Sequence, residues 1–360
     1  MGSIAVIGAA GFVGSRLIES FILNGFKDFY SVLRSHRSLG RLSRFGSAAN
    51  IKIADAENEA ALLPAIRDCS IVVNLISGNP AGIIKSTKAI YNSCVTTGVK
   101  RFIHLSSAAV YGRVESPEIP DDSPPIKNHW MPYASAKASA ELFLRSVLTS
   151  SPPEITILRP GIVWGPRSRW SINAALDLIN HAAYLVGDGS GVCNTIYVDN
   201  LISCILTCSN HRTSASGFFN VSDDEFVTWR DFYGSLARYL SYDMSNIPSV
   251  PADRFRPSLK GRLDDIMLSS IYNKLKTHIP VETRALIKHW LMNRLVKDAV
   301  DMETKKNRRH IDVTREMWNL QTTKFKLSNS KFAKHFNYRP HFSFAHGSEM
   351  TMHWLSFLGI

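Results

Sequence analysis

Two side chains that could transfer a proton lie four residues apart in the stretch MPYASAK (131–137), where Tyr133 precedes Lys137. Residues at this spacing are neighbours on one face of a helix. A phenol has an ordinary pKa of about 10, so it acts as a base near neutral pH only where a nearby positive charge favours the phenolate. Lys137 could supply that charge. Tyr272 and Lys276 have the same spacing, however, so spacing alone does not identify the reactive pair.

A pair of serines precedes Tyr133 and favours it over Tyr272. The stretch HLSSAAVYG (104–112) places Ser106 and Ser107 after an apolar run that is typical of a strand. In a doubly wound sheet the carboxyl ends of the strands line the ligand crevice. The segment around Tyr272 lacks such a serine-bearing strand and is basic, so we interpret its tyrosine and lysine as a surface or packing pair.

A glycine-rich turn stands near the start of the sequence. The stretch IAVIGAAGFVGSRL (4–17) carries three glycines between a predicted strand and a predicted helix. Glycines permit a tight turn and close backbone approach, and a helix N-terminus offers free N–H groups to a pyrophosphate. We therefore predict a nucleotide cofactor. The residues of the turn expected to contact it are Gly8, Gly11, Phe12, Val13 and Gly14.

The end of the second predicted strand indicates which cofactor it is. An acidic residue there normally binds the ribose hydroxyls of NAD, but SVLRSHRS (31–38) supplies Arg34, with His36 and Arg37 nearby. A guanidinium at this place suits the 2′-phosphate of NADP. We favour NADP over NAD; the alternative is that Arg34 lies on the surface or stacks on the adenine.

The elements that must position these residues follow a clear pattern. Short β-branched runs alternate with amphipathic helical stretches in the N-terminal half, as in a parallel sheet covered by helices on both faces. We predict an α/β fold: a Rossmann-type doubly wound parallel sheet with a smaller, mostly helical C-terminal substrate lobe. The NAD(P)-binding domain would span 1–165 with 195–222 returning to it, and the lobe would span 166–194 and 223–360.

Composition excludes several classes of protein. The 360 residues are 45% hydrophobic and 20% charged, which is typical of a globular chain. The five cysteines form no CxxC pair, so we expect neither disulfides nor a metal site but a reducing compartment. No leader peptide and no apolar run long enough to cross a bilayer is evident, so we predict a cytoplasmic protein without a transmembrane segment.

The net charge of +12 is concentrated in the last third of the chain. Residues 251–360 contain 20 Lys and Arg against 10 Asp and Glu. A basic region can attract nucleic acid, a phosphorylated substrate or acidic lipids, or can be a solvated surface. No nucleic-acid-binding motif is found, so we predict a small-molecule substrate and no nucleic-acid partner.

In their order and spacing, these motifs resemble the extended short-chain dehydrogenases/reductases, the NAD-dependent epimerase/dehydratase family. The resemblance covers most of the chain. Besides the glycine turn, the serines and the Tyr133–Lys137 pair, it rests on Asp55 after the third strand, NLISG (74–78), LRPGIVWGPR (158–167), YVDNL (197–201) and the closing stretch from residue 327.

The resemblance implies a role for each matching residue. Tyr133 would be the acid/base, Lys137 its electrostatic partner and ligand of the nicotinamide ribose, and Ser107 the donor of a hydrogen bond to the substrate oxygen. Ala108 and Arg167 would also contact the substrate. Further contacts to the cofactor are expected from Asp55, Ala56, Leu75, Ser106, Pro160, Ile162 and Val163. The resemblance also implies a homodimer.

Departures from the family pattern bear on the reaction. Family dehydratases carry an acidic pair directly after the catalytic serine or threonine, whereas this chain has Ala108 and Ala109, which disfavours dehydration. Nucleotide-sugar epimerases tend to have an asparagine where Ile162 stands and an arginine where Cys193 stands, both of which bind the diphosphate. Their absence weakens the nucleotide-sugar hypothesis without excluding it.

We therefore predict an NAD(P)-dependent oxidoreductase or epimerase that transfers a hydride at a secondary alcohol or ketone, on a sugar or nucleotide sugar. The first alternative is an NADP-dependent ketoreductase, or a hydroxysteroid or dihydroflavonol type of dehydrogenase, acting on an apolar substrate. The second is a cofactor-binding scaffold without catalysis. Residues 260–318 include a basic amphipathic stretch (282–298) that could be a lobe helix, a lid, a subunit contact or a membrane-surface patch.

Overall fold

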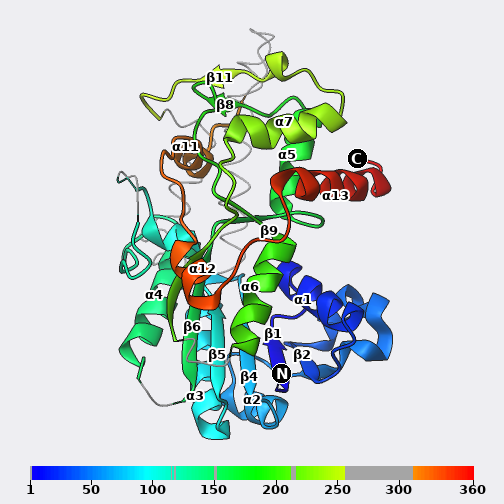
Figure 1. Cartoon of the computed structure of the whole chain (residues 1–360), viewed down its shortest axis with the longest axis vertical. Helices are drawn as coiled ribbons and strands as arrows, with labels where there is room; N and C mark the ends of the chain where they lie inside the picture. Colours follow the sequence, from blue (N-terminus) through cyan, green and yellow to red (C-terminus); the bar gives the residue numbers. More distant parts are fainter. Residues whose placement is uncertain (1, 115, 117–118, 150–151, 212–215, 256–310) are drawn as a thin grey trace, which may run out of the picture.

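The computed structural model describes residues 2–114, 116, 119–149, 152–211, 216–255 and 311–360 (Figure 1). Within this part of the chain seven strands form one sheet, in the order β10-β6-β5-β4-β1-β2-β3, and each neighbouring pair is parallel. These strands are β1 (Ile4–Ile7), β2 (Phe29–Leu33), β3 (Ile51–Ile53), β4 (Ile71–Asn74), β5 (Arg101–Leu105), β6 (Glu154–Pro160) and β10 (Gly217–Val221).

Helices cover both faces of this sheet, because its strands bury apolar side chains on both sides. In β1, Ile4 and Val6 belong to one apolar core, whereas Ala5 and Ile7 alternate with them and belong to the core on the opposite face. One face carries α1 (Phe12–Leu23) and α6 (Val198–Asn210); the other carries α2 (Glu59–Ile66), α3 (Pro80–Thr97) and α4 (Pro132–Ser146). The predicted doubly wound α/β fold is confirmed.

A second lobe lies beyond the carboxyl edge of the sheet (Figure 1). It has an aromatic core of its own, in which Trp164, Trp229 and Phe232 are buried. Its described helices are α5 (Arg169–Ile179), α7 (Trp229–Tyr239), α11 (Arg315–Gln321) and α13 (Phe344–Phe357), and α12 (Ser330–Phe336) packs against β10. Two small parallel sheets complete it: β7 (Ile162–Trp164) with β9 (Thr195–Tyr197), and β8 (Leu185–Val186) with β11 (Ser249–Val250).

The segment 195–222, predicted to return to the sheet domain, divides its two strands between two sheets. β10 joins the main sheet beside β6, with Gly217 opposite Thr156, and α6 packs against α1. β9 pairs instead with β7, which follows β6 after Gly161. The predicted basic stretch 282–298 and the pair Tyr272 and Lys276 lie outside the described residues.

Three further features of the described residues concern the cysteines, possible metal ligands and possible membrane-spanning helices. All five cysteines are free and buried. The described residues contain no group of three or more His, Cys, Asp or Glu side chains placed to hold a metal ion. None of the helices in the described part of the chain is both long and apolar enough to span a membrane.

A buried asparagine joins the lobe to the sheet domain. Asn200 Nδ2 donates to Asp223 Oδ1 and to the Phe342 carbonyl, both at 2.8 Å, and Asn200 Oδ1 accepts from the His341 and Phe342 amides at 3.0 Å. Asp223 also accepts from the Tyr197 amide at 2.8 Å, while burial raises the pKa of its carboxyl to about 6. Because these groups are shielded from water, each depends on the others for its hydrogen bonds.

Replacing Asn200 with alanine should therefore lower the free energy of unfolding by about 3 kcal/mol, because it leaves several buried groups without partners. Chemical denaturation followed by tryptophan fluorescence measures this. Asn210→Ala, at the exposed end of the same helix, is the control and should change stability by less than about 0.5 kcal/mol. Equal effects of the two variants would contradict the role assigned to Asn200.

Candidate active site

Ser107 and Tyr133 meet at the carboxyl end of β5. Ser107 follows this strand and begins the 3-10 helix η3 (Ala108–Tyr111), where its hydroxyl accepts a hydrogen bond from the Ala109 amide at 3.2 Å. Tyr133 is the second residue of α4. Burial raises the pKa of Tyr133, and a hydrogen bond from Ser107 lowers it. The structure thus brings together the serine and the tyrosine that the sequence analysis selected.

Lys137 lies one helical turn further along α4 and is fully buried. Its Nζ donates to the carbonyl oxygen of Leu105 at 2.6 Å, at the end of β5, and to that of Ile76 at 2.8 Å, just beyond β4. Burial lowers the pKa of Lys137 to about 7, whereas the two carbonyl oxygens favour the ammonium form. An ammonium has three N–H donors, so one is left for a further acceptor.

Two glycines of the turn, Gly8 and Gly14, leave no room for a side chain. Gly8 has a φ of +88°, which side chains disfavour, and a Cβ on Gly14 would lie 2.3 Å from the Gly8 carbonyl oxygen. The Gly11 amide donates to the same oxygen at 2.9 Å, and α1 begins at Phe12 without a side-chain cap. This close backbone turn at an uncapped helix start fits the pyrophosphate of a dinucleotide.

The other residues predicted to contact the cofactor follow strands of the same sheet. Parallel strands end at one edge, so these residues are collected along the carboxyl edge of the sheet although they are far apart in sequence. Arg34 and Asp55 are exposed, and Ala56, Leu75, Pro160 and Ile162 are buried. Asp55 Oδ1 accepts from the Glu57 amide at 3.1 Å and so also shapes its own turn. Their contacts with a cofactor stay predictions.

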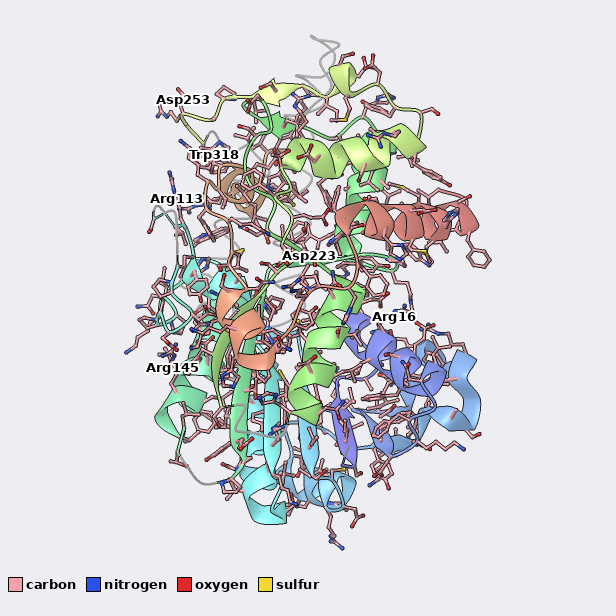
Figure 2. The ribbon with its side chains drawn as sticks, in the orientation of Figure 1. Arg16, Arg113, Arg145, Asp223, Asp253 and Trp318 are labelled. Atoms are coloured by element: carbon pink, nitrogen blue, oxygen red, sulfur yellow. The ribbon has the colours of Figure 1, made fainter. Side chains whose placement is uncertain are left out.

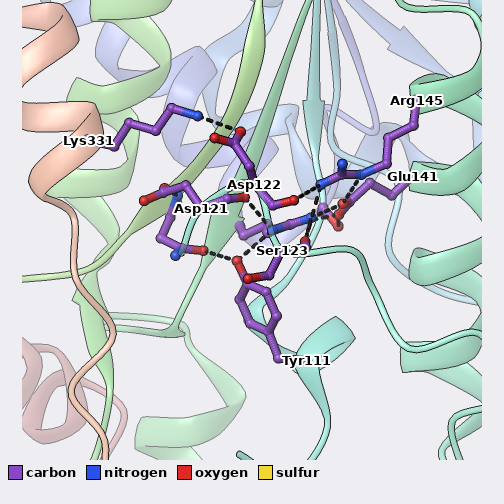
Figure 3. Close-up of polar contacts among 10 residues, drawn as sticks. Tyr111, Asp121, Asp122, Ser123, Glu141, Arg145 and Lys331 are labelled. Carbon is purple, nitrogen blue, oxygen red and sulfur yellow. Dashed lines mark hydrogen bonds and ion pairs between the residues drawn. The ribbon is translucent and has the colours of Figure 1, made fainter. Parts of the chain in front are cut away.

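A buried ion pair joins Glu141 of α4 to Arg159 of β6 (Figure 3). Glu141 and Arg159 have no exposed side-chain surface, and Arg159 Nε donates to Glu141 Oε2 at 3.0 Å, with a second, short contact from Nη2 to Oε1. Ser106 Oγ donates to Glu141 Oε2 at 3.0 Å. Glu141 therefore ties α4 both to β6 and to the serine beside Ser107.

Arg159 extends this network to the loop before α4. Its guanidinium donates to the Tyr111 hydroxyl at 2.5 Å and to the carbonyl oxygens of Asp121 and Ser123 at 2.7 and 3.0 Å. Tyr111 in turn donates to Asn220 Oδ1 at 2.7 Å, in β10. The donors of the buried guanidinium are thus directed at oxygen atoms, which is the condition under which a buried charge is tolerated.

Glu141, which ties α4 to β6 beside the candidate site, was not among the predicted site residues. A signal was present, since Glu141 stands four residues after Lys137 and eight after Tyr133, on the same side of α4. Its partner Arg159 was noted only as part of a motif. Ser106, predicted to contact the cofactor, donates its hydroxyl hydrogen to Glu141, and its contact with a cofactor stays a prediction.

Three residues that bear on substrate recognition lie outside the catalytic group. Ile162 and Cys193, at the positions where nucleotide-sugar epimerases tend to bind diphosphate, are buried in the lobe core. Arg167 is exposed; burial and the charge of Arg44 lower its pKa, while Glu19 raises it. Its charged neighbours therefore come from α1 and from the 3-10 helix η2 (Ser43–Ala49), and its contact with substrate stays a prediction.

Comparison with known proteins identifies the class. A family model described as the NAD dependent epimerase/dehydratase family matches residues 4–222. The chain therefore belongs to this family, as its resemblance to extended short-chain dehydrogenases/reductases had indicated. The prediction of an NAD(P)-dependent enzyme is confirmed at this level.

Individual relatives are more distant. The N-acetyl-alpha-D-glucosaminyl-diphospho-ditrans,octacis-undecaprenol 4-epimerase of Escherichia coli O157:H7 is 29% identical over 263 residues, 69% of this chain and 74% of that protein. The sterol-4-alpha-carboxylate 3-dehydrogenase, decarboxylating, of Dictyostelium discoideum is 27% identical over 252 residues, 65% of this chain and 75% of that protein. The fold is similar to that of the UDP-glucose 4-epimerase of Thermotoga maritima, with a TM-score of 0.68 at 19% identity over 99% of this chain and all of that one.

We expect Glu141→Ala to lower the free energy of unfolding by about 3–5 kcal/mol, because it leaves the Arg159 guanidinium buried without its carboxylate. Urea denaturation measures this loss. The control is Lys331→Ala, which removes the exposed ion pair with Asp122 in the same region and should cost at most about 1 kcal/mol. A loss for Glu141→Ala no larger than that of the control would mean that the buried pair does not hold this edge together.

Proposed function

We propose that the chain is an NAD(P)-dependent oxidoreductase or epimerase that transfers a hydride at a secondary alcohol or ketone of a sugar or nucleotide sugar. The observation that carries the proposal is the meeting of Ser107, Tyr133 and Lys137 at the carboxyl ends of β4 and β5. β1, which leads into the glycine turn, is the next strand of the sheet after β4. A cofactor on the turn and a substrate at the serine would therefore be adjacent.

Each residue of the chain has a definite task in this reaction. Ser107 donates a hydrogen bond to the substrate oxygen, and Tyr133 takes the proton of the alcohol or returns it to the ketone. Because burial raises the pKa of Tyr133, the phenolate needs the positive charge of Lys137. The remaining donor of Lys137 is available to the ribose. A bound nicotinamide would supply the hydride acceptor and, when oxidised, further positive charge.

The preference for a sugar is supported by the character of the similar epimerases and by the site itself. The name of the Escherichia coli relative describes a 4-epimerase of a diphospho-linked amino sugar. Ala108 and Ala109 offer no acidic group for the removal of water, so epimerisation or simple oxidation and reduction is favoured over dehydration. Because Ile162 and Cys193 are apolar and buried, a diphosphate would have to be bound by basic residues at other positions.

A second candidate, an NADP-dependent reductase or steroid-type dehydrogenase for an apolar substrate, is favoured by one observation. Ala108, directly after the catalytic serine, packs in an apolar cluster with Val110, Leu327 and Phe325. An apolar wall beside the reacting centre suits a ring system without hydroxyl groups. The third candidate, a scaffold without catalysis, predicts no turnover even with bound cofactor, which the presence of all three catalytic residues argues against.

Tyr133→Phe should lower kcat by at least about 100-fold and leave the affinity for the cofactor unchanged, because only the hydroxyl that moves the proton is lost. Stopped-flow absorbance of the nicotinamide measures turnover, and calorimetry measures binding. Tyr239→Phe, on an exposed tyrosine of α7, should retain full activity. Normal turnover in Tyr133→Phe would refute the assignment.

We also propose NADP as the preferred cofactor. Arg34 is exposed at the end of β2, where a 2′-phosphate would arrive, and Arg37 and Arg41 follow in the 3-10 helix η1 (His36–Arg41). A phosphate is bound best where several guanidinium groups are free to approach it. A cytoplasmic homodimer is proposed as well, on the family resemblance and the free cysteines.

Arg34→Asp should reverse the cofactor preference toward NAD, because a carboxylate repels the 2′-phosphate and accepts the ribose hydroxyls instead. The ratio of kcat/KM for NADP to that for NAD should fall by about tenfold or more. The same change at Arg67, exposed at the end of α2 and thus near the opposite edge of the sheet, should leave the ratio unaltered. An unchanged ratio in Arg34→Asp would sink the NADP assignment.

A further inference from the structure

Two polar side chains, Asn74 and His104, are buried side by side at the carboxyl ends of β4 and β5. They are partners in the register of this parallel pair, and both are almost completely shielded from water. Val72 and Phe102, two positions earlier on the same strands, belong to the apolar core beneath α2, α3 and α4. Side chains alternate along a strand, so Asn74 and His104 face the same helices. Polar groups in such a place need hydrogen bonds from the protein.

Hydrogen bonds fix the orientation of the Asn74 side chain. Its Oδ1 accepts from the backbone amide of Ile76 at 3.1 Å, and because that amide can only donate, the amide nitrogen of Asn74 points the other way. Nδ2 donates to Nδ1 of His104 at 3.1 Å and to the Thr87 hydroxyl at 3.5 Å. His104 Nδ1 is therefore an acceptor, and the ring hydrogen is on Nε2.

His104 is held in its neutral form. A protonated ring would have no acceptor for Asn74. Burial and the charge of Lys137 also lower the pKa of His104 well below its usual value. The Nε2–H is shielded from water and has no hydrogen-bond partner among the described residues, which costs free energy. Packing alone would favour an apolar ring here, and what a histidine adds is the acceptor that orients Asn74.

The two carbonyl groups that hold Lys137 belong to the backbone beside this pair. Leu105 directly follows His104, and its carbonyl oxygen accepts from Lys137 Nζ at 2.6 Å. The second acceptor, at 2.8 Å, is the carbonyl oxygen of Ile76, the residue whose amide is bound by Asn74. Because Ile76 lies beyond the end of β4, its orientation depends on this side-chain contact rather than on the strand ladder.

Lys137 depends on these two carbonyl groups for its position. Other charged side chains of the sheet domain, such as Arg16 on α1 and Arg145 on α4, are partly exposed and lie towards opposite flanks of the domain (Figure 2). Lys137 is buried instead, and no ion pair to it is found among the described residues. A change in the direction of either carbonyl would therefore move the ammonium.

We propose that Asn74 and His104 are positioning residues for Lys137: the neutral imidazole orients the Asn74 amide, and the amide directs the Ile76 backbone so that its carbonyl holds the ammonium. This rests on the proposed function, in which that ammonium favours the Tyr133 phenolate. Asn74 and His104 act through Lys137 and need touch neither substrate nor cofactor in this role.

Two replacements of His104 in the full chain, with its nicotinamide cofactor added, test the proposal. His104→Phe keeps an aromatic ring and removes both the acceptor and the unpartnered N–H, whereas His104→Gln retains an acceptor oxygen for Asn74. The substrates are UDP-glucose, UDP-N-acetylglucosamine and a 3-hydroxysteroid, followed by the absorbance of reduced nicotinamide. We expect kcat for alcohol oxidation to fall about tenfold or more in His104→Phe and less than about threefold in His104→Gln, with KM unchanged in both.

The pH profile supplies a readout that packing alone would not move. Alcohol oxidation needs the Tyr133 phenolate, so kcat declines on the acidic side as the phenol is protonated. A displaced ammonium leaves the pKa of Tyr133 higher, so the acidic limb should shift to higher pH in His104→Phe and in Asn74→Leu, but not in His104→Gln. Burial and the charge of Glu316, which also raise that pKa, are unchanged in these variants.

Ser93→Ala is the matched control. Ser93 is buried on α3, which covers the same face of the sheet, and its hydroxyl also has no hydrogen-bond partner within the described part of the chain. This variant should change neither kcat nor the pH profile. Thermal melting of every variant shows whether it is folded.

The outcomes separate the two proposals. If the wild-type chain is active and the apolar variants at positions 74 and 104 keep its kcat and pH profile, the inference is refuted and the proposed function stands, even if the variants melt at a lower temperature. A loss in His104→Gln as large as in His104→Phe also refutes it, because the acceptor then has no role. If one apolar variant does not fold, the other decides. If the wild-type chain oxidises none of the three substrates, both proposals fall.

Discussion

The buried ion pair between Glu141 and Arg159 is the interaction on which the catalytic edge depends. It joins the middle of α4 to β6, and through Ser106 it reaches the turn that carries Ser107. Burying two charges costs free energy, which is offset here because the guanidinium and the carboxylate each have several hydrogen-bond partners. These hydrogen bonds favour one rotation of α4 about its axis. In that orientation Tyr133 and Lys137 lie at the carboxyl edge of the sheet.

The order of the strands in the sheet brings the predicted cofactor site next to the predicted catalytic residues. β4 lies between β1 and β5, so the glycine turn after β1 and the serine turn after β5 are separated by one strand although about 100 residues separate them in sequence. Lys137 bonds the carbonyls at the ends of both β4 and β5. A single lysine is thus held by the two strands that flank the predicted nicotinamide site, which explains why it is buried despite its charge.

Two sets of contacts attach the lobe to the sheet domain. Asn200 and Asp223 fix its C-terminal segment to the sheet domain, and α11 is held near Tyr133 by contacts of arginine with tryptophan. Positions that would bind a diphosphate in nucleotide-sugar epimerases belong instead to the lobe core, as Ile162 and Cys193 are both buried. We expect recognition of the substrate to involve other residues, and Phe325 of the lobe packs in the apolar cluster that contains Ala108.

The sequence by itself determined the features that depend on neighbouring residues: the strands and helices of the sheet domain, the glycine turn, and the spacing of Tyr133 and Lys137 on one helix face. Local periodicity and backbone conformation are encoded within a few residues, so they can be read without a structure. Only the tertiary structure decided that Glu141 pairs with Arg159, that β9 joins β7 rather than the main sheet, and that Ile162 is core. These outcomes depend on which distant segments pack together, and the local periodicity of a sequence does not specify those contacts.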